Sequence, residues 1–167
     1  MREDGYAQVT SRKVAERAGL KPQLVHYYFR TMDDLFEGLF RHAISAQLGL
    51  LERAAASEDP LVALFELACD PASAALQLEF LALSNHRKGL KAQIATFGAE
   101  LNRREAEILR QELDRRGIAL PHFTPEQLAT LFQTSARGLA FAGQYNAQRF
   151  QSARDVTIEW LRSLGSN

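Results

Sequence analysis

The chain has 167 residues, 46% apolar and 24% charged, proportions typical of one globular domain or of a small head on a larger body. A chain of this length buries roughly 70% of its unfolded surface and can form a core without disulfides. The single cysteine, Cys69, excludes an intramolecular disulfide and a cysteine-based zinc or iron–sulfur site. The beginning of the sequence contains neither a spanning stretch nor a secretion signal, so we expect a soluble, cytoplasmic protein.

Charge is distributed unevenly along the chain, although 20 Lys and Arg balance 20 Asp and Glu overall. Residues 1–32 contain 6 basic and 3 acidic side chains, whereas residues 33–167 contain 14 basic and 17 acidic ones. A basic head on an acidic body is typical of a protein that binds nucleic acid through one module. A solvated helical face also carries such an excess by chance, so the charge pattern alone is weak support.

Prolines and capping residues predict where helices begin. Four of the five prolines stand where a first helical residue is expected, and three of these follow a residue able to cap; the four are Pro22, Pro60, Pro71 and Pro125. Three segments have the spacing of a capping box, namely Thr31 to Asp34, Thr124 to Gln127 and Ser152 to Asp155.

Apolar residues recur at intervals of three and four, which is the spacing of amphipathic helices. The resulting long helices cover about residues 33–56, Leu90 to a stop signal at Arg115–Gly117, 124–145 and 152–164. No segment alternates convincingly with a period of two, so the predicted fold class is all-α.

The first 30 residues contain the pattern of a helix-turn-helix. Thr10 or Ser11 can cap a helix to about Ala18, Gly19 breaks it, and Pro22 starts a second helix reaching about Tyr28. A small Ala15 permits close crossing of the two helices, and Gly19 permits the left-handed backbone of a tight turn. We expect Val25 and Phe29 to pack inward against Val14 and Ala18, leaving outward the side chains of Lys21, Gln23, His26 and Tyr27.

These residues resemble the DNA-binding head of the TetR family of transcriptional regulators. The resemblance covers residues 5–36 and rests on Gly5-Tyr6, the run from Thr10 to Ala15, Ala18-Gly19-Leu20, the run from His26 to Phe29, and the run from Asp33 to Phe36. It implies a head over 1–36 that binds operator DNA and a helical body over 37–167 that dimerises and holds a small-molecule effector.

Matching the head position by position implies a set of DNA contacts: Thr10, Ser11, Arg12, Lys21, Pro22, Gln23, Leu24, His26, Tyr27 and Tyr28. Arg12 matches a position that can reach a base, where paired hydrogen bonds to guanine discriminate by about 1 to 3 kcal/mol. A solvated surface arginine is the alternative for Arg12. For the two tyrosines, the alternative is that one belongs to the core of the head.

Two features depart from the family pattern. Met32 stands where the family usually has a lysine, which removes one candidate phosphate contact. Most of the family's first helix is also missing before Gly5. We expect the cause to be that Met1 was placed too far downstream as the start of the protein sequence. If the short chain is real, the head should be partly melted without DNA, seen as rapid amide exchange in residues 6–30.

The resemblance implies that the last two long helices pair with a second subunit, because one helix-turn-helix contacts too few base pairs. Small residues there would permit close approach or would pack within one chain: Ala136, Gly138, Ala140, Ala142 and Gly143. Candidate effector-binding residues are those on segments around the middle of the body, although each also suits an ordinary core or surface position: Phe65, Phe80, Leu83, His86, Phe97, Leu101, Phe132 and Phe141.

The favoured function is a homodimeric repressor that binds a palindromic operator and is released by a small hydrophobic effector, with no cofactor, metal or membrane partner. One alternative is a helical small-molecule-binding bundle whose truncated head no longer binds DNA. A small helical enzyme is a third possibility, but the sequence contains neither a zinc-protease motif, nor a phosphate-binding glycine loop, nor a nucleophile elbow. We therefore expect no enzymatic activity.

Overall fold

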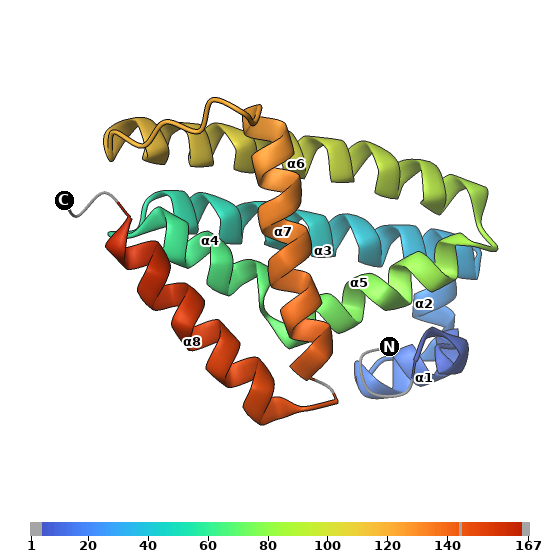
Figure 1. Cartoon of the computed structure of the whole chain (residues 1–167). Helices are drawn as coiled ribbons and strands as arrows, with labels where there is room; N and C mark the ends of the chain where they lie inside the picture. The colour runs from blue at the N-terminus through green and yellow to red at the C-terminus, as the bar shows by residue number, and fades with distance from the viewer. Residues whose placement is uncertain (1–4, 144, 165–167) are drawn as a thin grey trace. The chain divides into compact units, whose positions relative to one another are not determined.

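The computed structural model describes residues 5–143 and 145–164, and the predicted charges on Arg2, Glu3 and Asp4 lie outside this range. The fold is all-α: the described residues form helices without any strand (Figure 1). A short 3-10 turn, η1, covers Tyr6–Gln8. The α-helices are α1 (Ser11–Arg17), α2 (Pro22–Tyr28), α3 (Met32–Ala55), α4 (Pro60–Ala68), α5 (Pro71–Ser84), α6 (Lys88–Arg115), α7 (Pro125–Gly143) and α8 (Ala147–Ser163).

The local start signals are confirmed at most helices. All four predicted prolines are the first residues of their helices, which are α2, α4, α5 and α7. Thr124 and Gln127 form a reciprocal capping box, with backbone N–H to side-chain oxygen distances of 3.0 and 3.2 Å. Thr31 and Asp34 form the same arrangement at 2.9 and 3.0 Å. Each such cap contributes about 1 kcal/mol, so these helix starts are encoded locally.

The predicted start of the last helix at Ser152 is wrong. Helix α8 begins five residues earlier, where the Asn146 side chain accepts a hydrogen bond from the Arg149 N–H at 2.9 Å. Ser152 and Asp155 are exposed residues inside the helix, and Asp155 instead accepts a hydrogen bond from Gln151 at 2.8 Å. The capping spacing at Ser152 occurred by chance, because the helix is already capped upstream by Asn146.

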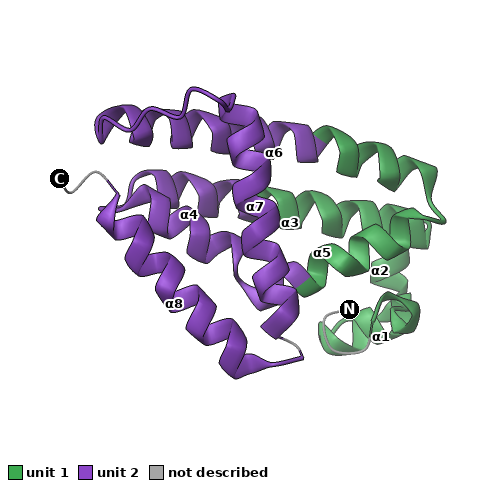
Figure 2. Cartoon of the chain, viewed as in Figure 1, with its two compact units in different colours: residues 1–46, 75–96 green, residues 47–74, 97–167 purple. Residues whose placement is uncertain are grey.

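The chain divides into two compact units (Figure 2): residues 1–46 with 75–96, and residues 47–74 with 97–167. The first unit therefore contains more than the predicted head of 1–36, and the functional boundary after residue 36 stays a prediction. Its core contains the Phe40 and Phe80 rings, packed edge to face with centroids 5.1 Å apart. The other buried apolar residues of this unit are Ala15, Val25, Leu35, Phe36, Leu83 and Leu90.

The second unit is built around a core to which α4, α6, α7 and α8 all contribute, including Leu61, Leu109, Ala129 and Leu161. Cys69 is a buried core residue, with its Sγ 3.5 Å from the Ala136 carbonyl oxygen. Burial raises the pKa of its thiol to about 11, which keeps it protonated and unreactive at neutral pH.

Arg116 joins three segments of the second unit. Its guanidinium lies 2.7 Å from carboxylate oxygens of both Asp59 and Glu112. It also donates to the Leu161 and Leu164 carbonyls at 3.0 and 3.2 Å, satisfying acceptors at the end of α8. The Arg115 and Arg116 hydrogen bonds lower the pKa of the buried Glu112 carboxyl against the effect of burial.

Across the part of the chain that the structure describes, no single helix has both the length and the apolar composition needed to cross a membrane. Helices α4 and α5 reach the required length and apolar composition only when they are counted as one segment, and a bend of 51° separates them.

Candidate nucleic-acid interface

The turn between α1 and α2 has the geometry that the sequence predicts. Gly19 has a φ of +66°, so the backbone is in the left-handed region. The Leu20 N–H donates to the Ala15 carbonyl at 2.9 Å and the Gly19 N–H donates to the Glu16 carbonyl at 3.1 Å, the pair of bonds that ends a helix in a Schellman motif. Ala15 is completely buried, as expected for a small residue where two helices cross.

The inner side of the turn differs in part from the prediction. Val25 is buried and Phe29 half-buried, but Ala18 is exposed and does not contribute to the core. Phe29 packs instead over Gly38 on α3, where an added Cβ would lie 2.9 Å from the phenylalanine ring. The small size of Gly38 therefore lets the end of α2 approach α3 closely, a contact that periodicity did not indicate.

One face of α2 is polar and exposed, as predicted. Lys21, Gln23 and His26 are exposed, and the side chain of Lys21 is not used to cap the helix. Tyr27 and Tyr28 are 78% and 69% exposed, so neither tyrosine belongs to the core. Their rings lie edge to face with centroids 5.2 Å apart. Exposed lysine, glutamine, histidine and tyrosine side chains are those that contact phosphates and base edges.

The start of α1 lies against this face. Thr10 is the residue that caps α1, its Oγ1 accepting from the Lys13 N–H at 3.2 Å. The Ser11 Oγ and His26 Nε2 lie 3.2 Å apart, which joins the beginning of α1 to the middle of α2. The structure thus brings Thr10, Ser11 and His26, three of the predicted DNA contacts, to one surface.

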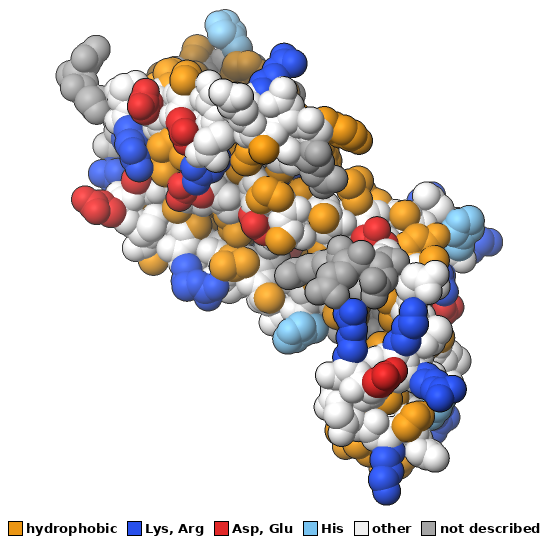
Figure 3. Space-filling view, turned by 90° about the horizontal axis from the view of Figure 1, so that it is seen from below, with side chains coloured by type: hydrophobic (Ala, Val, Ile, Leu, Met, Phe, Trp, Pro, Cys, Tyr) orange, Lys and Arg blue, Asp and Glu red, His pale blue; other side chains and the backbone are white. Residues whose placement is uncertain are grey.

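Basic side chains surround this surface. Arg12, Lys13, Lys21 and Arg30 are all exposed, and Figure 3 shows blue side chains over the lobe that contains α1 and α2. Lys13 also donates to the Gln8 side-chain oxygen at 3.1 Å. Concentrated positive charge on one face is the electrostatic footprint of phosphate binding. Pro22 and Leu24, the remaining predicted contacts, are exposed on the same helix.

Two polar contacts within the first unit fix the head, and sequence reasoning did not find them. The Tyr6 N–H donates to Glu79 of α5 at 2.6 Å. Arg87, just before α6, forms an ion pair with Asp33 at 2.6 Å and lies 5.0 Å from the centroid of the Phe36 ring. Because Asp33 is in the first turn of α3, the pair attaches the helix that follows the head to the α5–α6 turn.

The predicted effector-binding residues are distributed over both units. Phe80, Leu83 and His86 belong to the first unit and the other five to the second. Phe65 and Phe132 contact one another, with ring centroids 5.9 Å apart, whereas His86 is exposed. Phe97, Leu101 and Phe141 are half-buried. Their role in an effector site stays a prediction.

The described residues contain no group of three or more His, Cys, Asp or Glu side chains placed to hold a metal ion. A basic helix-turn-helix with an exposed polar face on its second helix defines a DNA-binding head.

Comparisons with known proteins agree with this class. Residues 1–39 match the family model described as bacterial regulatory proteins, tetR family. A TetR transcription regulator from Haloarcula marismortui is similar in structure, with a TM-score of 0.75 and 17% identity over 98% of this chain and 90% of that chain. A transcriptional regulator from Rhodococcus sp. Rha1 has a TM-score of 0.72 and 22% identity, over 96% of this chain and 88% of that one. No curated protein matches.

The head carries the family's sequence pattern and the chain has the family's fold. Residues 1–39 are a TetR-type DNA-binding head, and the rest of the chain shares the fold of these regulators.

Proposed function

We propose that the protein is a homodimeric repressor that binds a palindromic operator through α2 and is released from it by a small hydrophobic effector. The exposed polar face of α2 carries this proposal, because it lies beside the start of α1 with basic side chains around it. In this arrangement α2 enters the major groove, and the start of α1 contacts the DNA backbone.

The proposed contacts divide by chemistry. Arg12 and Gln23 are long, exposed and able to form paired hydrogen bonds, Arg to guanine and Gln to adenine. Lys21, Thr10 and Ser11 contact phosphates, which positions the head without determining sequence preference. His26, Tyr27 and Tyr28 contact the edge of the groove, and Pro22 and Leu24 bring the first turn of α2 against the bases.

The proposed dimer forms through exposed stripes on α7 and α8. On α7, four of the exposed residues recur at helical spacing and are small or apolar: Leu131, Ser135, Gly138 and Ala142. On α8, Val156 and Trp160 stand one turn apart and are 63% and 57% exposed. Exposed apolar side chains on two helices of one compact unit are typical of a helical subunit interface.

Only some of the small residues predicted for this interface are available to it. Ala136 and Ala140 are completely buried within the protomer, so for these two the alternative of packing within one chain is correct. They lie on the face of α7 that carries the core, whereas Gly138 and Ala142 are exposed on another face. Periodicity alone could not assign the faces, because both are rich in small residues.

In the proposed regulation, the effector favours a body conformation in which the two heads no longer match half-sites about 34 Å apart. Helix α3 follows the head directly and is unbroken from Met32 to Ala55, so we infer that it is the connecting lever. Linkage requires reciprocity: operator DNA must weaken effector binding by the same factor by which the effector weakens DNA binding.

The test begins with selection of duplexes from a random pool by the full-length protein, followed by titration of the selected site. Lys21→Ala should weaken binding about equally for all sequences and lower the salt dependence by about one unit of slope. Gln23→Ala should relax preference at one base pair and cost about 1 to 3 kcal/mol. Lys91→Ala, an exposed lysine on α6, is the matched control.

If no duplex is enriched and Lys21→Ala behaves like Lys91→Ala, the proposal fails. The alternative of a ligand-binding bundle whose head no longer binds DNA would then account for the fold.

A further inference from the structure

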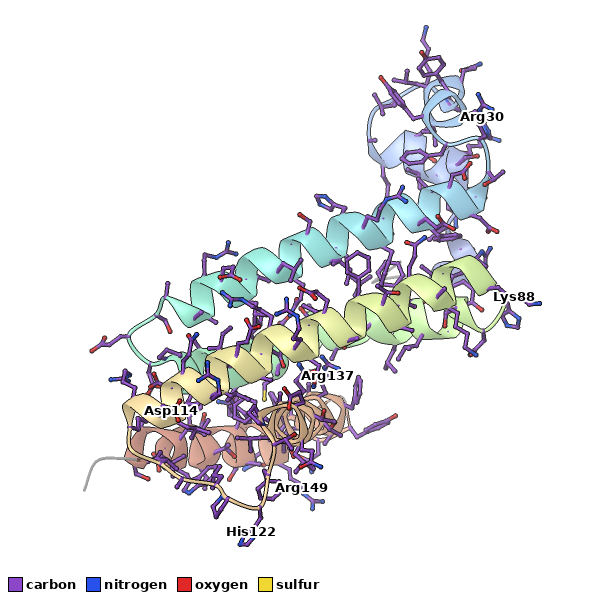
Figure 4. The ribbon with its side chains drawn as sticks, turned by 90° about the horizontal axis from the view of Figure 1, so that it is seen from above. Arg30, Lys88, Asp114, His122, Arg137 and Arg149 are labelled. Atoms are coloured by element: carbon purple, nitrogen blue, oxygen red, sulfur yellow. The ribbon has the colours of Figure 1, made fainter. Side chains whose placement is uncertain are left out.

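A polar cluster lies in the second unit, between α6 and α7. Glu105 comes from α6, and Gln133 and Arg137 come from α7 one turn apart. The Arg137 guanidinium donates to the Gln133 Oε1 at 2.8 Å and interacts electrostatically with Glu105. Figure 4 shows Arg137 on the side of α7 that faces α6.

The two helices are also joined one turn earlier. The Asn102 side-chain amide on α6 donates to the Thr130 hydroxyl on α7 at 2.9 Å. The cluster therefore occupies a defined contact between the two helices, held by side chains on both.

The hydrogen-bonding capacity of the cluster is not used up. Gln133 is only 7% exposed, and its Nε2 is a fully buried donor with no partner among the described residues. Glu105 is 8% exposed, and no described residue donates a hydrogen bond to its carboxyl group. A buried polar group without a partner is costly and rare in a native fold, so each one calls for an explanation.

Apolar side chains also lie next to the cluster. One turn before Glu105 lies the half-buried Leu101, and one turn before Gln133 lies Ala129, which is completely buried. Burial raises the pKa of the Glu105 carboxyl to about 7, although the charge of Arg137 lowers it. An unused buried donor and a mostly buried carboxyl thus belong to one cluster, with Arg137 linking them, and a few polar groups beside apolar side chains suit the polar end of a ligand site.

We propose that Glu105, Gln133 and Arg137 form the polar end of the effector site, which takes a neutral, largely apolar molecule with a hydrogen-bond acceptor beside an N–H or O–H donor. The acceptor bonds to the Gln133 Nε2 and the donor to the Glu105 carboxylate. A neutral ligand is favoured because Arg137 already balances Glu105, so an added charge would have no counter-charge in a region of low dielectric. This inference rests on the proposed function, in which the body binds an effector.

Four probe molecules with the same aromatic ring distinguish a neutral polar ligand from an anionic, a cationic and a purely apolar one: benzamide, benzoate, benzylamine and toluene. Only benzamide carries a neutral acceptor beside a donor. We expect benzamide to raise the melting temperature of the full-length protein. In a calorimetric titration it should bind saturably, with millimolar affinity, and more tightly than each of the other three probes. Gln133→Met should weaken its binding about ten-fold, the loss of one buried hydrogen bond, whereas Gln111→Met, at an exposed glutamine on α6, should not.

A pH profile tests Glu105 separately. Arg137 is the charged group that faces this carboxyl in the described residues. Benzamide should bind several-fold more weakly at about pH 6 than at about pH 8, because protonation replaces a charged acceptor by a weaker neutral one. Glu105→Gln should abolish this dependence. If Gln133→Met does not fold, the pH profile of the natural protein and of Glu105→Gln still tests the proposed site.

The inference is overturned if benzamide does not bind, if benzoate or benzylamine binds more tightly, or if Gln133→Met binds benzamide as the natural protein does. Crystals soaked with benzamide that contain only water between Gln133 and Glu105 would also overturn it. Operator binding is measured in parallel on the same preparation. If benzamide does not bind but the protein still binds its operator, only this inference fails and the proposed DNA binding stands.

Discussion

Replacing Gly19 by alanine isolates the backbone requirement of the helix-turn-helix. An added Cβ at Gly19 meets no atom within 4 Å, so the substitution introduces no steric conflict with neighbours. Its cost comes from the φ of +66°, which an L-residue adopts at an expense of about 1 to 2 kcal/mol. Relief of that strain requires the Leu20 to Ala15 hydrogen bond to lengthen or break.

Gly98→Ala is the matched control, because a Cβ there also meets nothing within 4 Å but the residue lies inside α6. In a helix interior the same change stabilises by about 0.5 to 1 kcal/mol. The two variants should therefore differ by about 2 kcal/mol with opposite signs. With a urea m-value of about 2 kcal/mol/M, their unfolding midpoints should lie about 1 M apart.

The assay is urea unfolding followed by far-ultraviolet circular dichroism, with all variants at one protein concentration because a dimer's midpoint depends on it. Gly19→Ala should also weaken operator binding by up to about ten-fold, since the turn positions α2. If Gly19→Ala proves as stable as Gly98→Ala, the argument that this turn demands a left-handed residue is refuted.

Three further predictions concern the second unit. Trp160→Glu should convert the proposed dimer to monomer in sedimentation velocity, whereas a dimer that survives the substitution would remove α8 from the proposed interface. Arg116→Met should lower the free energy of unfolding by about 3 to 5 kcal/mol because it leaves buried Glu112 short of a partner; Arg115→Met, at a side chain 63% exposed, should cost under about 1 kcal/mol, and equal losses in urea unfolding would contradict the burial argument. Burial raises the pKa of Glu105 from 4.5 to about 7, so the folded state binds the extra proton and stability should fall by up to about 3 kcal/mol as pH rises through this window. Glu105→Gln should show none of that loss, and identical stability profiles for it and the natural protein would show that this carboxyl does not titrate in the window.

Local signals in the sequence were sufficient for most of the secondary structure and for the head. The prolines at helix starts, two of the three capping boxes and Gly19 each act within four residues, so their effect does not depend on the rest of the chain. The polar face of α2 was predictable for the same reason: a short helix with one buried residue, Val25, presents its other side chains to solvent.

Surfaces between helices required the tertiary structure. Ala136 and Ala140 could not be told from Gly138 and Ala142 until the core of the second unit showed which side of α7 it covers. Ser152 has a valid capping spacing, and only the hydrogen bond at Asn146 shows that the helix had already begun. In each case, two arrangements satisfied the local pattern, and long-range packing selected one of them.

The residue pattern was sufficient to predict an all-α fold with a helix-turn-helix at its start, because capping, turn geometry and helical periodicity are properties of neighbouring residues. Tertiary structure alone decided that Glu105 lies with Gln133 and Arg137, and that Arg116 joins Asp59, Glu112 and the end of α8. Residues so far apart in the chain leave no periodic signal, since their proximity and their burial arise only when the helices pack.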